Sequence, residues 1–311
     1  MSLGVLNNLN AIYASSNLNN TSNSLSKTLQ QLSSGSKINS GADDAAGLSL
    51  VNGLQANATA LSQSQTNAAE GIGILKVADG ALSQVTNLLN RAVTLATEVS
   101  NGTLTTSQGT AANQEYQSIL SEINNIGTTT TYNQTQVFGQ GAANVVTIYT
   151  GDSSSNGASV DALSFAQLTS ASVGDAGGAV ALGTSTAGTG SIAGLAEISY
   201  TAGTSGSVDL TAKDISTQAG AQSTLNLLNT AITDVAAQDG YIGSQINTLS
   251  AVSSVLSTQQ QNVVAAQNAV QATDYAQASS DMSKYEILSQ TGISALAQAN
   301  SVQQEVTKLL Q

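Results

Sequence analysis

Hydrophobic residues recur at alternating spacings of three and four between Leu75 and Val99. These apolar positions are Leu75, Ala78, Leu82, Val85, Leu89, Ala92, Ala96 and Val99, and Leu88 and Leu95 lie beside them. The spacing is typical of a helix that packs along another helix over several turns. Because a helix with one apolar stripe is not stable alone in water, the pattern predicts a partner helix elsewhere in the chain.

The segment from residue 225 to residue 270 is the best candidate for that partner. Its apolar residues recur every seventh position, at Leu228, Val235, Ile242, Leu249, Leu256, Val263 and Val270. A shorter amphipathic helix carries Ala112, Tyr116, Ile119, Ile123 and Ile126. Since a short polar link joins it to the first stripe, we expect it to fold back alongside. Gly71, Gly73, Gly240 and Gly243 are expected to loosen or interrupt the long helices.

Both ends of the chain are also predicted to be helical. Residues 3–32 carry Leu18, Leu25, Leu29 and Leu32, and the last helix carries Tyr285, Leu288, Val302, Val306 and Leu309. The first segment is rich in Asn and Ser, which are mediocre helix formers. Because little apolar material remains to cover these stripes within the chain, we expect neighbouring subunits to complete them.

The middle of the chain, residues 140–220, has a different composition, dominated by Gly, Ser, Thr and Ala. Short β-like runs at Val145–Tyr149, Val160–Phe165, Ile198–Tyr200 and Val208–Leu210 predict a small, partly β insertion. The alternative is a disordered linker. The predicted fold is therefore mainly α: a long antiparallel helical bundle formed by the N- and C-terminal segments, with a partly β insertion in the middle.

Composition excludes much chemistry. The 311 residues include no Pro, Cys, His or Trp. Without Cys and His, the common zinc sites, a Ser-His-Asp triad, a Cys nucleophile and the usual haem ligands are excluded. A net charge of -12 with only 7 basic residues argues against nucleic-acid binding. We therefore expect neither enzyme activity nor a metal or cofactor.

Two further local features bear on chemistry and destination. Asp43 and Asp44 form a carboxylate pair, but no partner base or nucleophile is evident, and a position in a first helical turn already accounts for them. Residues 1–10 lack the basic and apolar regions of a signal peptide. No apolar stretch is long enough for a transmembrane helix, so we expect no membrane insertion.

Two motifs lie at opposite ends of the chain. Residues 32–47 read LSSGSKINSGADDAAG, and the C-terminal motif comprises Asp274–Ala276, Met282–Lys284, Ile287–Gln290 and Leu296–Asn300. With these motifs in this order, the chain resembles bacterial flagellin over about three-quarters of its length. The insertion is not covered by this resemblance.

The resemblance implies a structural subunit that self-assembles into the flagellar filament for swimming motility. Residues 1–41 and 273–311 would form an inner coiled-coil layer that orders on polymerisation, 42–139 and 221–272 an outer helical bundle, and 140–220 a variable surface-exposed insert. The subunit would leave the cell through the flagellar channel without a cleaved signal peptide. Implied partners are the export apparatus, an export chaperone at the C-terminal segment, and the cap and hook-junction proteins. The alternative is a hook–filament junction protein, which shares the paired terminal helices.

The stretch Asn90–Ala96 aligns with a family region that contacts neighbouring subunits and, in some members, an animal flagellin receptor. Arg91, Leu95 and Glu115 match that pattern, whereas Val93 and Thr94 stand where charged residues are usual. The alternative interpretation is a solvated charge at Arg91 and a core-edge residue at Leu95.

Overall fold

The computed structural model describes residues 8–138, 144–151, 160–166, 168–169, 172–173, 209–210 and 213–309. The helices are α1 (Leu9–Ser34), α2 (Ala45–Ser100), α3 (Thr106–Thr129), α4 (Gln218–Gln271) and α5 (Tyr275–Leu309). The strands are β1 (Thr131–Tyr132), β2 (Thr135–Gln136), β3 (Asn144–Tyr149), β4 (Val160–Phe165), β5 (Leu168–Thr169) and β6 (Ser172–Val173). The mainly α prediction is confirmed. Two of the expected strands form, residues 198–200 and 208 lie outside the described residues, and Asp209 and Leu210 are not in a strand.

The chain divides into two compact units. The terminal unit comprises residues 1–56 and 262–311, and the central unit comprises residues 57–261. Each boundary falls inside a long helix, α2 or α4. Each unit combines helices from the N-terminal and C-terminal parts of the chain, as the predicted pairing of these parts requires.

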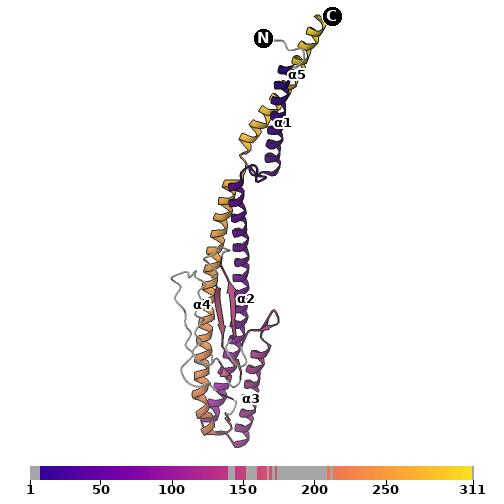
Figure 1. Ribbon diagram of the computed structural model, residues 1–311. Coiled ribbons are helices and arrows are strands. Elements are labelled where there is room, and N and C mark those ends of the chain that lie inside the picture. Colours follow the sequence, from indigo (N-terminus) through magenta and orange to yellow (C-terminus); the bar gives the residue numbers. More distant parts are fainter. Residues whose placement is uncertain are drawn as a thin grey trace. The chain divides into compact units, whose positions relative to one another are not determined.

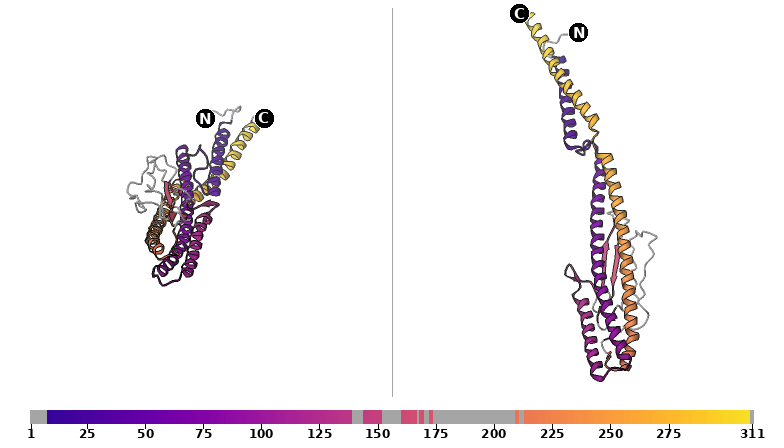
Figure 2. Two further views of the ribbon diagram at one scale, coloured as in Figure 1. Left: turned by 90° about the horizontal axis from the view of Figure 1, so that it is seen from below. Right: turned by 180° about the vertical axis from the view of Figure 1, so that it is seen from behind.

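In the central unit, α4 is the partner that the stripe on α2 predicted. Gln65 of α2 is hydrogen-bonded to Gln260 of α4 at 3.2 Å, and Gln218 Nε2 donates to Ser100 O at 3.1 Å. Residue numbers therefore rise along α2 as they fall along α4, which makes the two helices antiparallel (Figures 1 and 2). The third helix, α3, lies beside them.

A tight turn sends the chain back from α2 into α3. Gly102 has φ +70°, in the left-handed region that glycine adopts without strain, and its N–H donates to Val99 O at 3.2 Å. Thr105 then caps α3: its hydroxyl accepts from Gln108 N, and its own N–H donates to Gln108 Oε1 at 2.9 Å.

Glycines inside the long helices do not interrupt them, contrary to the expectation from the sequence. At Gly71 the absent side chain leaves room for Ile148 and Leu249, whose atoms lie 3.1 Å from where a Cβ would be. At Gly240 and Gly243 no atom lies within 4 Å of that position. Packing of the remaining apolar face therefore outweighs the weak helix propensity of glycine.

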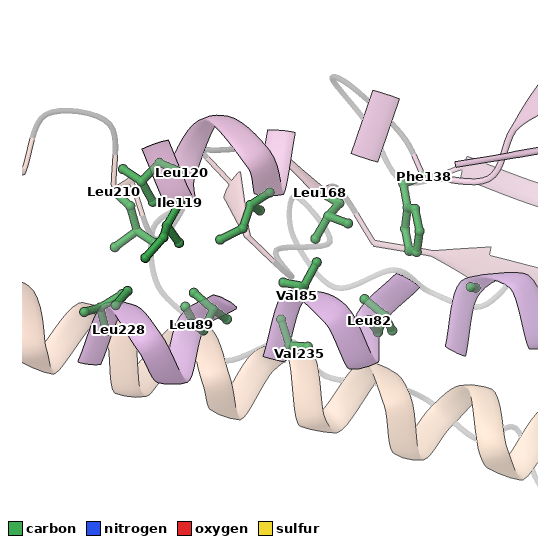
Figure 3. Packing of buried hydrophobic residues seen from close by; sticks show 14 of the residues in the cluster. Leu82, Val85, Leu89, Ile119, Leu120, Phe138, Leu168, Leu210, Leu228 and Val235 are labelled. Atoms are coloured by element: carbon green, nitrogen blue, oxygen red, sulfur yellow. The ribbon is translucent and has the colours of Figure 1, made fainter. Parts of the chain in front are cut away.

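The hydrophobic core of the central unit is built from all three of its helices (Figure 3). Leu82, Val85 and Leu89 of α2 face Leu228 and Val235 of α4 on one side and α3 on the other. Buried residues from the described parts of the range 140–220 join the same core, namely Ile148, Leu163, Phe165, Leu168, Leu210 and Ile215. The base of the insertion is thus packed against the helices.

The β3–β4 hairpin is held between α2 and α4 by side chains that bond to both of its edges. Asn67 of α2 donates to Tyr149 O of β3 at 2.9 Å. On the other edge, Gln238 of α4 donates to Ser164 O at 3.3 Å, and Ser164 N donates to the Tyr241 hydroxyl at 3.4 Å. Three backbone groups on the outer edges of this two-stranded sheet are therefore bonded to the helices, which makes these edges less available for pairing with another strand.

In the terminal unit, α1 and α5 pack on each other as an antiparallel pair (Figure 1). Asn8 caps α1 by accepting from Ala11 N at 3.1 Å, and its amide also donates to Ala299 O of α5 at 2.9 Å. Further along, a Leu18 carbon lies 3.3 Å from the position that a Cβ on Gly292 would occupy. Glycine thus allows a close approach of the two helices.

The α1–α2 and α4–α5 connectors are hydrogen-bonded to each other. Lys37 N donates to Gln271 O at 2.7 Å, and Thr273 N donates to Gly35 O at 3.1 Å. Gly35 has φ +68° and ends α1 in the left-handed conformation. The N- and C-terminal motifs therefore meet at this pair of connectors.

Asp43 and Asp44 both have structural partners in this connector. Asp43 pairs with Lys27 Nζ at 2.8 Å and accepts from Asn39 N and Ser40 N. These contacts, the Lys27 hydrogen bond first, lower the pKa of Asp43 to about 2. Contrary to the expectation from the sequence, neither aspartate lies in the first turn of α2, which begins at Ala45. Asp44 directly precedes the helix and accepts from Gly47 N at 2.9 Å.

Candidate functional site

Exposed apolar side chains are concentrated in the terminal unit. We define the exposed apolar set as the large apolar residues of α1 and α5 that are more than a third exposed: Leu9, Ile12, Tyr13, Leu29, Tyr275, Ile287, Leu288, Ile293 and Val302. Leu50 and Val264 are also exposed in this unit. Among the described residues of the much larger central unit, the same criterion selects Val77, Val145, Tyr149 and Val255. Apolar surface gathered in this way marks an interaction site.

The residues predicted to form the inner layer divide into two groups. Leu18, Leu25, Leu32 and Tyr285 are partly buried, whereas Leu29, Leu288 and Val302 are 46%, 45% and 44% exposed. Val306 lies in α5 and Leu309 ends it, but their side chains lie outside the described residues. Part of the predicted stripe therefore closes the α1–α5 pair, and part is left on the surface.

The sequence pattern missed several members of the exposed apolar set, including Tyr13, Tyr275, Ile287 and Ile293. They lie outside the alternating spacing of three and four residues by which the apolar stripes were identified. A usable signal was present, because each is a large apolar residue in a segment otherwise rich in Ser, Asn, Gln and Ala. Off-seam apolar residues in a polar helix point to a second contact surface.

The polar composition of α1 leaves this helix few means of stabilising itself. Lys27 is the only charged residue between Leu9 and Ser34, so ion pairs along the helix are absent from that range. Asn, Ser and Thr have low helix propensity, and their side chains compete for backbone hydrogen bonds. The stability of α1 therefore depends on packing, and α5 covers only one side of it.

A second candidate surface joins α2 and α3. Arg91 Nε lies 2.7 Å from Glu115 Oε1, and the two side chains are 53% and 46% exposed. The hydrogen bond from Arg91 lowers the pKa of Glu115, and the same bond raises the pKa of Arg91. Leu95, by contrast, is 3% exposed and belongs to the core. The structure thus brings Arg91 and Glu115 together on the surface, whereas Leu95 lies in the core.

A carboxylate pair lies across α2 and α4. Burial and then the neighbouring Asp79 raise the pKa of Asp239. Among the described residues, no group of three or more Asp, Glu, His or Cys is placed to hold a metal ion. No helix in the described part of the chain combines the length and apolar character needed to span a membrane.

Antiparallel helices that leave a large apolar surface uncovered define a structural protein that associates with other chains. The family model described as "Bacterial flagellin N-terminal helical region" matches residues 5–143, and the one described as "Bacterial flagellin C-terminal helical region" matches residues 225–310. Together these matches cover most of the chain. The chain belongs to the flagellin family, the structural proteins of bacterial flagellar filaments.

Relatives match along nearly the whole chain. Flagellin of Listeria monocytogenes is 29% identical over 290 residues, covering 92% of each chain. Flagellin B of Vibrio cholerae is 28% identical over 381 residues, covering 100% of each chain. A crystal structure of Bacillus cereus flagellin matches at 22% identity with a TM-score of 0.41, covering 65% of this chain and 94% of that chain.

Proposed function

We propose that this chain self-assembles into the flagellar filament through the exposed apolar set of α1 and α5. The observation that carries the proposal is the presence of nine large, exposed apolar side chains among the described residues of α1 and α5, which pack on each other. In the filament, α1 and α5 would form the inner layer, the central unit the outer helical layer, and the insertion the outward-facing part.

Burial of apolar area supplies the driving force. Full burial of a large apolar side chain contributes about 1.5–3 kcal/mol relative to exposure. Burial of the nine partly exposed side chains against neighbouring subunits would therefore add to the stabilisation that α1 and α5 gain from packing on each other. We infer that both helices order on polymerisation, because a polar, nearly uncharged α1 gains most of its stability from contacts with neighbouring subunits.

Export without a cleaved signal peptide is part of the same proposal, with a chaperone bound to residues 273–311. Five members of the exposed apolar set lie in α5, namely Tyr275, Ile287, Leu288, Ile293 and Val302. A chaperone that covers these side chains inside the cell would prevent premature assembly. The export apparatus, the filament cap and the hook-junction proteins are further proposed partners.

Removal of residues 302–311 is the direct test. We expect the truncated protein to form no filaments, because α5 loses part of its apolar surface. Its central unit should remain helical, since the core residues of that unit are intact. Electron microscopy under polymerising conditions and circular dichroism measure the two properties. Normal filaments from the truncated protein would refute the proposed layer.

A matched pair of point variants separates the surface from general hydrophobicity. Leu288→Ser removes a 45% exposed leucine from α5, and Val145→Ser removes a 49% exposed valine from the central unit. We expect slower polymerisation for Leu288→Ser and an unchanged rate for Val145→Ser. Equal rates for the two variants would show that exposure alone, and not its place on α5, controls assembly.

Limited proteolysis of the purified monomer tests the ordering of the ends. We expect rapid cleavage outside residues 44–271 and slow cleavage within them, because the fully buried core lies in the central unit. Polymerisation should then protect the ends. Intact ends with early cuts inside α2 or α4 would contradict ordering on assembly.

We also propose that the Arg91–Glu115 face contacts a neighbouring subunit. Exchange of the two residues, Arg91→Glu with Glu115→Arg, preserves an internal ion pair and inverts the charges that a neighbour would meet. A contact predicts impaired polymerisation in the exchanged protein, whereas a purely internal pair predicts normal polymerisation. The same variants in a reporter assay test recognition by the animal flagellin receptor.

Abundance distinguishes a filament subunit from the alternative, a hook–filament junction protein. A filament subunit should dominate the protein recovered from sheared surface filaments, whereas a junction protein should be rare there. Quantitative mass spectrometry of sheared filaments gives the answer.

A further inference from the structure

Three Asn-Gly dipeptides occur in the sequence, and the structure places two of them in opposite environments. Asn52-Gly53 lies inside α2, Asn101-Gly102 lies at the turn that follows α2, and Asn156-Gly157 falls outside the described residues. A glycine after asparagine has no side chain to block its backbone nitrogen. That nitrogen can therefore reach the asparagine side-chain amide where the backbone is free to rotate.

The hydrogen bonds that Asn101 and Gly102 make are at or beyond the long end of the ordinary range. Asn101 is exposed, and its Nδ2 donates to Thr103 Oγ1 at 3.4 Å. Gly102 N donates to Val99 O at 3.2 Å, at the fraying end of the helix. By contrast, Gly53 N is bonded within α2 and has helical backbone on both sides. The backbone rotation that brings Gly102 N close to the side-chain carbon of Asn101 therefore requires less free energy than the same rotation at Asn52-Gly53 inside α2.

We propose that Asn101 is a site of spontaneous deamidation. The Gly102 nitrogen gives up its proton to solvent base and attacks Asn101 Cγ, and a new C–N bond closes a five-membered imide. The bond from Cγ to Nδ2 breaks, and ammonia leaves with a proton taken from solvent. Water then hydrolyses either carbonyl of the imide, which yields aspartate or isoaspartate without any oxidation or reduction.

The product changes the corner at which α2, α3 and α4 meet. A new carboxylate stands at the C-terminal end of α2, where uncapped carbonyls already carry partial negative charge. Glu98 adds a further negative charge nearby in sequence. Isoaspartate also lengthens the backbone by one atom beside Gly102. Gln218 Nε2 lies 3.0 Å from the position that a Cβ on Gly102 would occupy, so the two residues are in close contact. Deamidation would thus loosen the hydrogen bond from Gln218 to Ser100 O.

The experiment uses the folded full-length monomer in mildly alkaline buffer prepared with oxygen-18 water. Peptide mapping with electron-based fragmentation distinguishes Asn, Asp and isoaspartate at each position. We expect oxygen-18 to enter residue 101 as both Asp and isoaspartate, at least about tenfold faster than residue 52. No conversion at residue 101, or equal rates at the two positions, would overturn the proposal.

Two controls separate local structure from sequence. In the urea-unfolded protein, Asn52 and Asn101 should react at similar rates, because both are followed by glycine and neither is protected. The variant Asn101→Gln should lose the reaction at position 101 and keep it at position 52 when unfolded. A rate at Asn101 that does not exceed that at Asn52 after folding would show that the turn gives no special exposure.

Discussion

Leucines on α1 and α2 follow similar helical spacing but meet different surroundings. Leu89 of α2 has an exposed fraction of 0%, because α3 and α4 cover it together (Figure 3). Leu29 of α1 is 46% exposed, because α5 packs on α1 without covering this leucine fully. Helical spacing thus predicts which face of a helix is apolar, whereas the number of packing partners decides how deeply that face is buried.

The two units also differ in how they use polar groups. In the central unit, buried polar side chains such as Ser64 and Gln238 bond to backbone oxygens of the insertion. In the terminal unit, the most elaborate polar cluster is the Asp43 network at the connector. Polar groups therefore lock the central unit internally, and in the terminal unit they define where α1 ends and α2 begins.

The largest effect should separate the two leucines. Leu89→Ala should lower the free energy of unfolding of the monomer by about 2–5 kcal/mol, because it leaves a cavity in a closed core. Leu29→Ala should change it by no more than about 0.5 kcal/mol and should instead impair polymerisation. Urea unfolding followed by circular dichroism measures the stability, and light scattering measures the assembly. A destabilisation by Leu29→Ala as large as that by Leu89→Ala would remove the distinction between the units.

Glycine-to-alanine variants test how closely the central unit is packed. A Cβ on Gly127 of α3 would collide with the carbonyl oxygen of Leu168, so Gly127→Ala should destabilise the unit by about 1–3 kcal/mol. Gly80 of α2 has no atom within 4 Å of its Cβ position. Gly80→Ala should therefore stabilise the same unit by about 0.5–1 kcal/mol. Thermal unfolding of both variants provides the measurement, and a shift of the same sign in both would contradict the difference in packing.

The turn between β1 and β2 is a strained position inside the well-packed unit. Asn133 and Gln134 have φ of +48° and +65°, a conformation in which glycine is preferred to glutamine. Gln134→Gly should relieve that strain and stabilise the protein by a few tenths to about 1 kcal/mol. Gln136→Gly, two residues further on in β2, is the control and should destabilise. Chemical denaturation resolves the two directions.

The smallest predicted changes in the free energy of unfolding arise from changing the pH. They should have opposite signs for one aspartate in each unit. The pKa of Asp239 is raised in the folded protein, so the native state binds the proton more tightly than the unfolded state. Its contribution to stability is present at acid pH and is lost as the pH rises through the folded pKa. Asp239→Asn should therefore stabilise the protein at neutral pH and remove that loss.

Asp43 behaves in the opposite way in the terminal unit. Its pKa is lowered to about 2, so its contribution is present above the ordinary aspartate pKa and is lost as the pH falls towards 2. Asp43→Asn should flatten this acid limb, and Asp239→Asn should leave it unchanged. Unfolding curves of both variants between acid and neutral pH provide the comparison.

Much of the fold follows from periodicity. The stripe on α2, the seven-residue ladder on α4 and the apolar face of α3 are each visible in the sequence. In the structure the α2 stripe is buried, and the α4 ladder is buried from Leu228 to Leu256 but only half-buried at Val263 and Val270. Tyr116, Ile119 and Ile123 of α3 are buried. The capped turn at Asn101-Gly102 was also predictable, because glycine there ends a helix. These features depend on local spacing, which one sequence records directly.

Other features depend on contacts that spacing does not record. The sequence does not show that Ile148 packs against Gly71. Nor does it show that Asn67 and Gln238 donate hydrogen bonds to the edges of the β3–β4 hairpin. Tyr13 and Ile287 were missed because they lie off the seam. Arg91 and Glu115 were selected through the resemblance to flagellin, and their pairing at 2.7 Å emerged only when α3 was placed beside α2.

The hydrogen bond from Asn8 to Ala299 joins residues 291 positions apart, nearly the full length of the chain. Contacts of such long range form late in folding, because the intervening chain must first be brought together. α1 and α5 therefore cannot pair until both of these distant segments are present and close to each other. The antiparallel arrangement thus makes the terminal pair depend on both segments: a polypeptide interrupted before α5 cannot form it.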